Sequence, residues 1–387
     1  MEDWQHGGFG LYLHWPFCAS KCPYCDFNSH VRDRVDQDLW RSALLSEIDR
    51  VGQETKGRTL DTVFFGGGTP SLMDPDLVAD LMDRIRTTWR TSNIFETTLE
   101  ANPSSVEAGR FRAYRDAGIN RVSMGVQTLN DRDLRALGRL HSVAEARKAF
   151  DIARDCFDRV SFDLIYARQD QTLQEWEAEL KTALNMAVDH LSLYQLTIEP
   201  GTAFGAREAI GRLPGLPDED LGADMYERTQ EICGAAGMPA YEVSNHARPD
   251  AMSRHNMIYW RYGDYAGIGP GAHGRLSLTS GKWATSTHLS PEKWLDAVQR
   301  TGNGETPRSR IPLADQADEM LMMGLRLHDG ISTDRYEALS GHALPVEPLK
   351  ELIETGLLKL DGTQLRATSS GMMVLNAVLR QLLLAHT

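Results

Sequence analysis

Long hydrophobic runs are absent from this sequence. No apolar stretch approaches the ~20 residues that an α-helix needs to cross a bilayer, so an integral helical membrane protein is excluded. The first residues, Met1-Glu2-Asp3-Trp4-Gln5-His6, lack the basic flank and the apolar stretch of a signal peptide. We therefore expect a protein that is not exported and that works in the cytoplasm.

Cysteines and basic residues are also scarce. Three of the five cysteines lie close together, which argues against a disulfide framework and favours metal binding in a reducing compartment. The other two, Cys156 and Cys233, lie alone in helix-like segments and are expected to be buried small hydrophobic residues. The 41 Lys and Arg against 54 Asp and Glu give a net charge of -13. This balance disfavours a nucleic-acid surface, and no nucleic-acid partner is expected.

The first two thirds of the chain alternate between short β-branched or aromatic runs and amphipathic stretches. This pattern is typical of βα units around a parallel sheet. Six strands are expected, at residues 11–14, 62–65, 97–100, 121–126, 160–165 and 190–196. Six such units can form an open barrel or a doubly wound sheet, and in both architectures ligands bind at the C-terminal ends of the strands.

Polar and glycine-rich residues follow the expected strands at those ends. A cysteine loop follows the first strand, and Gly66-Gly67-Gly68-Thr69-Pro70 follows the second. Glu100 closes the third strand, and Gln127 follows the fourth. We therefore expect all of these residues at one mouth of the fold.

The pattern changes after Arg275. Residues 302–307, rich in Gly and Pro, are expected to form a linker. A helix at 314–327, a hairpin across Asp361-Gly362 and a final helix at 372–384 resemble a winged-helix module, for which a structural role or partner docking is expected rather than DNA binding. The predicted division is a core at 1–275, a connecting segment at 276–310 and a mainly helical C-terminal domain at 311–387.

Cys18, Cys22 and Cys25 have the spacing C-x3-C-x2-C. Three thiolates on one loop can hold three irons of a 4Fe-4S cluster and leave the fourth iron open to a small molecule. The cysteines alone also allow a zinc site that His14 or His30 completes.

With the aromatic Tyr24 before its third cysteine, this spacing resembles the signature of radical SAM proteins. The glycine run at 66–70 is similar to their second motif, which meets the amino-acid end of S-adenosylmethionine. The resemblance implies a 4Fe-4S cluster, S-adenosylmethionine with its adenine against Tyr24, and a partial (β/α)6 barrel.

Further segments resemble the HemN and HemW group of radical SAM proteins over nearly the whole chain. They are residues 12–18, 125–127, 137–141, 163–166 and 195–200. The resemblance implies that eight residues contact S-adenosylmethionine: Tyr12, Gly67, Gly68, Thr69, Glu100, Gln127, Arg139 and Asp163. Arg139 can offer its fork of donors to a carboxylate, and Asp163 can accept from ribose hydroxyls. Taken singly, each of these polar side chains is equally well explained as a buried group, at the rim of a barrel, whose hydrogen bonds are made within the protein.

Two absences bear on the branch within this group. The oxygen-independent coproporphyrinogen III oxidases carry another cysteine two positions after the third, where this chain has Asp26-Phe27. They also have a long N-terminal arm, for which the seventeen residues before Cys18 are too few. These absences argue against the oxidase, although the radical SAM residues are complete, and the residues do not decide whether the protein is an enzyme.

A positive feature is the segment His255-Asn256-Met257-Ile258-Tyr259-Trp260, which resembles the H-N-x-x-Y-W element of the haem-chaperone branch. The resemblance implies haem binding with His255 as an axial ligand. On chemistry alone, His255 can instead satisfy backbone groups while the aromatics pack. His273 is a weaker candidate for the same role.

The expected function is that of a haem chaperone. It would transfer haem to acceptor proteins of unknown identity, with the membrane surface as a candidate place of transfer, and would take electrons for its cluster from a donor protein. The alternative is an oxygen-independent coproporphyrinogen III oxidase that decarboxylates its substrate by radical chemistry.

Overall fold

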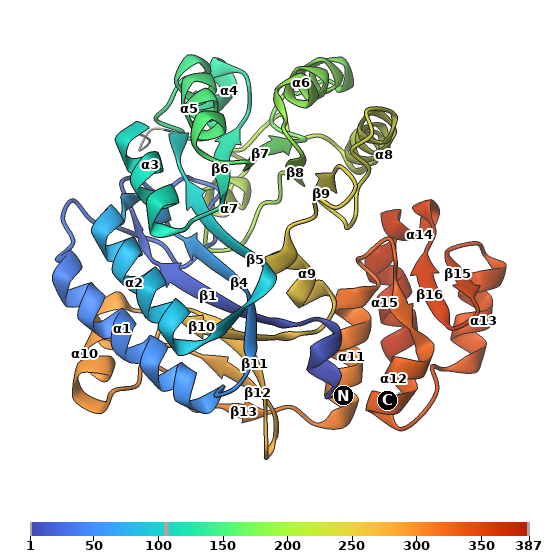
Figure 1. Cartoon of the computed structure of the whole chain (residues 1–387). Coiled ribbons are helices and arrows are strands. Elements are labelled where there is room, and N and C mark those ends of the chain that lie inside the picture. Colours follow the sequence, from blue (N-terminus) through green and yellow to red (C-terminus); the bar gives the residue numbers. More distant parts are fainter. Residues whose placement is uncertain (1, 104–107, 385–387) are drawn as a thin grey trace.

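One twisted sheet organises most of the chain (Figure 1). The computed structural model describes residues 2–103 and 108–384. The strands follow one another in space as β13-β12-β11-β10-β1-β4-β5-β6-β7-β8-β9. Their bounds are β1 Phe9–Trp15, β4 Thr59–Gly67, β5 Arg90–Ala101, β6 Arg121–Gln127, β7 Arg159–Tyr166, β8 His190–Gln195, β9 Asn245–Ala247, β10 Asp264–Ile268, β11 His273–Leu278, β12 Gly281–Ser286 and β13 Ser309–Arg310.

The centre of the sheet consists of six parallel strands, β1 and β4 to β8, each paired with the next. They coincide with the six strands expected from the sequence, so that prediction is confirmed. The two edges, β13 and β9, are not paired with each other, and the sheet is an open, partial barrel. All six C-terminal strand ends therefore point to one mouth.

Of the helices that follow the parallel strands, α1, α2, α3, α5, α6 and α8 cover the outer face of the sheet, whereas α7 lies at the mouth beside the cysteine loop, where the N–H of Phe204 donates to the carbonyl of Pro23 at 2.8 Å (Figure 1). The bounds of these helices are α1 Gln37–Glu54, α2 Pro75–Thr88, α3 Ala108–Ala117, α4 Asp131–Ala136, α5 Val143–Cys156, α6 Leu173–Met186, α7 Ala203–Glu208 and α8 Glu219–Ala235. The sequence explains where they begin: in α5 and α6, Ser142 with Glu145 and Thr172 with Glu175 form capping boxes. No helix in the described part of the chain has the length and apolarity that crossing a bilayer requires.

Residues 276–310, expected to connect two domains, instead belong to the main sheet. The hairpin of β11 and β12 extends the sheet beyond β10, and β13 pairs with β12. Helix α10 (Pro291–Thr301) packs against α1, where the rings of Trp294 and Trp40 stack with centroids 5.4 Å apart. Strand pairing thus decides the role of this segment, and Gly302 marks the end of α10, where it adopts the left-handed conformation.

The C-terminal part has its own core and a small three-stranded sheet, β14-β16-β15. Its elements are α11 Leu313–Gly324, β14 Ile331–Ser332, α12 Thr333–Ser340, α13 Val346–Glu354, β15 Leu358–Asp361, β16 Gln364–Ala367, α14 Ser369–Met373 and α15 Leu375–Leu384. The predicted hairpin is present, and Gly362 in its turn has φ 62°. The single final helix that was predicted is divided into α14 and α15 at Val374.

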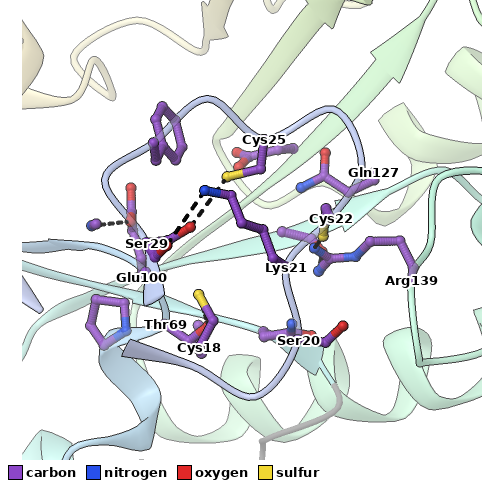
Figure 2. A pocket seen from close by; sticks show the side chains of 18 of the residues that line it. Cys18, Ser20, Lys21, Cys22, Cys25, Ser29, Thr69, Glu100, Gln127 and Arg139 are labelled. Carbon is purple, nitrogen blue, oxygen red and sulfur yellow. Dashed lines mark hydrogen bonds between the residues drawn. The ribbon is translucent and has the colours of Figure 1, made fainter. Parts of the chain in front are cut away.

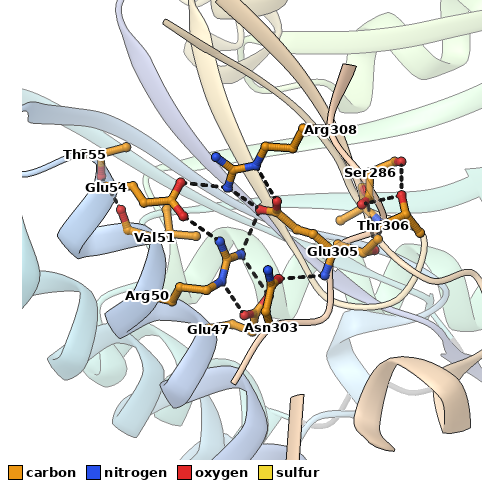
Figure 3. Close-up of polar contacts among 12 residues, drawn as sticks. Glu47, Arg50, Val51, Glu54, Thr55, Ser286, Asn303, Glu305, Thr306 and Arg308 are labelled. Atoms are coloured by element: carbon orange, nitrogen blue, oxygen red, sulfur yellow. Dashed lines mark hydrogen bonds and ion pairs between the residues drawn. The ribbon is translucent and has the colours of Figure 1, made fainter. Parts of the chain in front are cut away.

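An ion-pair network ties α1 to the chain before β13 (Figure 3). Arg50 binds Glu47 at 2.6 Å, Glu305 at 2.8 Å and Glu54 at 3.0 Å. Arg308 bridges Glu54 and Glu305 from the other side, at 2.7 and 2.6 Å. The side chains of Glu47 and Glu305 are 0% and 4% exposed, and loss of Arg50 would leave the buried Glu47 carboxylate without its cation while Glu305 keeps Arg308.

We expect Arg50→Met to lower the free energy of unfolding by about 3 kcal/mol, because it removes one side of a buried network. Urea unfolding at pH 7 measures the loss. The control is Arg84→Met, because Arg84 pairs with Asp49 at a site where the two side chains are 40% and 50% exposed. The expected loss there is about 0–1 kcal/mol. Equal losses in the two variants would contradict a stabilising role for the network.

Candidate functional site

The three clustered cysteines lie on a loop that a short parallel pair of strands closes at its base. β2 (Phe17–Cys18) pairs with β3 (His30–Val31), and the intervening loop carries Cys22 and Cys25. All three are free thiols, with Cys18 buried and the other two half-buried. They line one cavity at the C-terminal ends of the strands (Figure 2).

The glycine loop after β4 packs directly on the chain that leads into the cysteine loop. The N–H of Gly68 donates to the carbonyl of Trp15 at 2.7 Å, and the N–H of Thr69 donates to the carbonyl of Phe17 at 2.9 Å. A Cβ on Gly68 would lie 2.7 Å from the Phe17 oxygen, and Gly67 has φ 112°. Only glycine fits at these two positions. The Thr69 hydroxyl then donates to the Cys18 sulfur at 3.4 Å.

Two acidic side chains lie in the same cavity, inside the partial barrel. Glu100, near the end of β5, accepts from the N–H of Gly67 at 3.2 Å. Burial, reinforced by the charge of Asp163, raises the pKa of Glu100 to about 8. Burial likewise raises the pKa of Asp163 to about 6, against the opposing effects of Ser192, Arg121 and Arg139. A cationic ligand placed between them would favour their ionised forms.

Gln127 approaches the cysteine loop from the end of β6, and Arg139 approaches it from the turn after α4. Arg139 donates to the Cys22 sulfur at 3.2 Å and to the carbonyl of Gly125 at 2.7 Å. Gln127 has φ 73°, a conformation that is uncommon for a residue other than glycine and that occurs here where β6 ends. Tyr24 lies on the same side of the cavity and packs on Phe204, with ring centroids 6.4 Å apart.

The structure thus brings together nearly all of the site residues expected from the sequence. Those that line the cysteine cavity are Cys18, Cys22, Tyr24, Cys25, Gly67, Gly68, Thr69, Glu100, Gln127, Arg139 and Asp163. Tyr12 does not line it. Its ring lies beside an adjoining cavity, and its hydroxyl is 3.0 Å from Nδ1 of His14.

The structure does not bring together the ligands of the alternative zinc site. Nε2 of His14 lies 2.9 Å from the carbonyl of Asn28, and Nε2 of His30 lies 3.2 Å from the Asn28 side-chain oxygen. Among residues 2–103 and 108–384, no three His, Cys, Asp or Glu side chains converge as ligands of a single metal ion. A cubane cluster places different demands on the cysteines, because each thiolate binds a separate iron.

A second cavity of about 860 Å3 adjoins the first, and Phe27, Gly67 and Glu100 border both. Its volume is within the range of ligand sites, about 300–1,000 Å3. Its wall combines aromatic side chains of the barrel with residues just before and after the end of α11. The wall includes Tyr259, Trp260, Tyr265, His273, Met323 and Arg326.

His255 lies behind the wall of the second cavity, on α9 (Arg254–Trp260). Its ring is 1% exposed, and its two nitrogens lie 2.7 Å from the Thr62 hydroxyl and 2.6 Å from the Tyr259 hydroxyl. Burial lowers the pKa of His255 to about 3, so the ring is neutral. In this conformation neither nitrogen is available to a haem iron. Haem ligation by His255 therefore stays a prediction and requires Thr62 or Tyr259 to move.

Comparison with known proteins places this site in a family. Residues 12–183 match the Radical SAM superfamily, and residues 311–374 match the HemN C-terminal domain. The chain is 37% identical to "Heme chaperone HemW" of Escherichia coli (strain K12), over 95% of this chain and 96% of that protein. The chain belongs to the HemW family of radical SAM proteins. It is also 38% identical to "Radical S-adenosyl methionine domain-containing protein 1, mitochondrial" of Mus musculus, over 96% of this chain and 87% of that protein.

The fold of this HemW family member is shared with a solved structure. The chain resembles the coproporphyrinogen III oxidase HemN from Escherichia coli with a TM-score of 0.82 at 21% identity, over 98% of this chain and 92% of that one. The predicted fold class, a partial (β/α)6 radical SAM barrel followed by a mainly helical C-terminal domain, is confirmed.

The sequence patterns did not identify some polar residues of this HemW family site. Buried Arg121 faces the interior of the barrel, where its charge opposes the raised pKa values of Glu100 and Asp163. Ser123 lies opposite Glu100 in the strand register, and its side chain hydrogen-bonds to Asp163. Period-two polar positions in otherwise apolar strands are the signal that could have identified both residues. No local signal points to Arg326, because it comes from the C-terminal part.

We expect the stability of the ligand-free protein to fall as the pH rises from about 5 to 8.5, because of Glu100. The folded protein holds this proton up to about pH 8, whereas the unfolded chain releases it near 4.5, so the folded state binds more protons in this interval. Relative to Glu100→Gln, the wild type should lose on the order of 4 kcal/mol of unfolding free energy.

Urea unfolding across this pH interval measures the loss. Exposed Glu347→Gln is the control and should keep the wild-type slope. Parallel curves for the wild type and Glu100→Gln would show that Glu100 ionises normally in the folded protein.

Proposed function

We propose that this chain is a haem chaperone, which binds haem and transfers it to haem-requiring acceptor proteins. HemW family membership supports this function, since relatives named "Heme chaperone HemW" are 33–38% identical. The observation that carries the proposal is the cavity of about 860 Å3 beside the cysteine cavity. It has the volume and the aromatic wall for a porphyrin, and it adjoins the cysteine site at Gly67 and Glu100.

Cys18, Cys22 and Cys25 are the proposed ligands of a 4Fe-4S cluster. They are the free thiols of the cavity, and three thiolates leave one iron open for S-adenosylmethionine. When bound, the reduced cluster would supply an electron to S-adenosylmethionine. The electron donor is not identified. The Arg139 guanidinium lies beside these cysteines and donates to the Cys22 sulfur at 3.2 Å.

The remaining residues of the cysteine cavity fit S-adenosylmethionine by their chemistry. The backbone of Gly67 and Gly68 allows close approach, Thr69 offers a hydroxyl, and Glu100 offers a carboxylate to the ligand's ammonium group. Asp163 can accept from ribose hydroxyls, and Arg139 can reach a carboxylate. Gln127 and Tyr24 complete the wall, and Tyr12 would act from the adjoining cavity.

We expect Cys18→Ser, Cys22→Ser and Cys25→Ser each to abolish cluster assembly, because a serine oxygen is a poor substitute for a thiolate ligand of iron. Iron and sulfide analysis after anaerobic reconstitution measures the loss, together with the absorption of the cluster. The matched control is Cys156→Ser, which replaces a cysteine in α5 outside this cavity and should keep the full cluster content. Wild-type iron content in the three variants would refute the assignment.

The haem would lie in the second cavity, whose wall includes three His and Met side chains that can bind iron. Both ring nitrogens of His14 have hydrogen-bond partners, Tyr12 and Asn28, which leaves His273, whose side chain is exposed, and Met323 near the end of α11. His255 would then act on haem through Tyr259, whose hydroxyl it contacts and whose ring borders the cavity.

We expect His273→Ala to weaken and shift the Soret band of the haem complex in an anaerobic titration, because it removes an exposed imidazole from the cavity. His255→Gln should keep the band position, since an amide can still bond to Thr62 and Tyr259. The reverse pattern, a lost band in His255→Gln and an unchanged band in His273→Ala, would identify His255 as the iron ligand.

The same reconstituted protein separates the chaperone from the alternative oxidase. Incubation with coproporphyrinogen III, S-adenosylmethionine and a reductant should give no protoporphyrinogen, whereas apo-acceptor proteins should take up haem from the loaded protein. Turnover of the porphyrinogen would overturn the proposed function.

A further inference from the structure

The second cavity contains a cation that comes from the C-terminal part of the chain. Arg326 follows the end of α11 and borders the cavity together with Met323, three residues earlier. Among the described residues that line this cavity, Arg326 is the single Lys or Arg, whereas Asp26, Glu100 and Glu242 supply carboxyl groups. The position of this arginine therefore determines where a negatively charged group can enter.

Most hydrogen-bond donors of Arg326 are unused. A guanidinium has five N–H donors. In the described part of the chain, Nη1 of Arg326 donates to the carbonyl oxygen of Met322, which is one of the free carbonyls at the end of α11. Desolvation lowers the pKa of Arg326, so the group is partly withdrawn from water without a carboxylate bonded to it.

The nearest acid does not fill this role. Glu242 interacts with Arg326 only through its charge, and it accepts hydrogen bonds from the side chain of Asn245 and from backbone N–H groups of residues 243–245. Burial raises the pKa of Glu242 and so favours its neutral form, which further weakens its electrostatic attraction to Arg326. The remaining donors of Arg326 are thus free for a ligand.

Other partly buried arginines of this chain show what such a group ordinarily contacts. Arg275 binds Glu319 at 2.8 Å, and Arg335 binds Asp3 at 2.7 Å, in each case with two guanidinium nitrogens. A planar carboxylate is the partner that matches the fork of donors. We propose that Arg326 binds a carboxylate of the molecule that occupies the second cavity, and that for haem this group is a propionate. This assignment of the propionate rests on the proposed function.

The test compares haem with haem dimethyl ester, in which both propionates are neutral, on the wild type, Arg326→Gln and Arg326→Lys. Arg326→Gln should weaken haem binding roughly 10- to 100-fold, as expected for loss of a charge-assisted pair. Binding of the ester should be weak in the wild type and unchanged by the substitution. Arg326→Lys should recover part of the affinity, because it keeps the charge but not the fork.

Arg380→Gln is the matched control, because Arg380 is exposed on α15 of the same C-terminal part. It should bind haem as the wild type does. Thermal unfolding of all variants, with equal midpoints expected, checks that the fold is kept.

The outcomes distinguish the two proposals. Wild-type haem affinity in Arg326→Gln would overturn the role of Arg326 and leave the chaperone function intact. Equal weakening of haem and of its ester would also overturn the role, since the effect would not depend on the carboxylate. Metal-free protoporphyrin IX, followed by fluorescence, provides a probe without iron. A wild type that binds this porphyrin but not haem, and binds it less tightly in Arg326→Gln, would refute haem binding and support the carboxylate site. Binding of neither porphyrin would refute both.

Discussion

The site depends on the contact between the glycine loop after β4 and the chain that follows β1. Two backbone hydrogen bonds, from Gly68 and Thr69 to the carbonyls of Trp15 and Phe17, bring the loops together. No Cβ fits at Gly68 without a collision with Phe17. This approach places the Thr69 hydroxyl on the Cys18 sulfur and turns the Gly67 N–H towards Glu100. A larger residue here would separate the cysteine loop from the acidic interior of the barrel.

The two cavities differ in the charge that they offer a ligand. The interior of the barrel holds Glu100 and Asp163, whose pKa values burial raises although the charges of Arg121 and Arg139 oppose the shift. These two carboxyl groups suit the ammonium and sulfonium groups of the proposed S-adenosylmethionine. The outer cavity combines aromatic walls and three carboxyl groups with Arg326, and this arginine is the group there that suits the acidic edge of a flat apolar molecule. The proposed haem would therefore lie next to the cofactor, yet be recognised by a different part of the chain.

Much of the fold could be predicted because its signals are local. The six parallel strands contain short β-branched or aromatic runs whose apolar side chains pack under the helices, and the hairpin at Asp361-Gly362 follows from turn chemistry. The extension of the sheet through residues 276–310 could not be predicted in this way. Whether β11 pairs with β10 or forms a linker depends on an edge that exists only once the sheet has formed. The same holds for Arg326, which reaches the cavity only because the C-terminal part packs beside the barrel mouth.

The amino-acid sequence alone identified the residues that we propose carry the chemistry: three cysteines at a spacing suited to a cluster, the glycines after the second parallel strand, and the acids at the strand ends. It did so because each group is defined by neighbours in the chain or by the shared direction of parallel strands. Only the folded structure shows which of these side chains have atoms free to bind a ligand. His255 is identified by its motif, but Thr62 from β4 and Tyr259 from its own helix occupy both ring nitrogens. Availability depends on contacts between distant segments, and these form only when the chain folds.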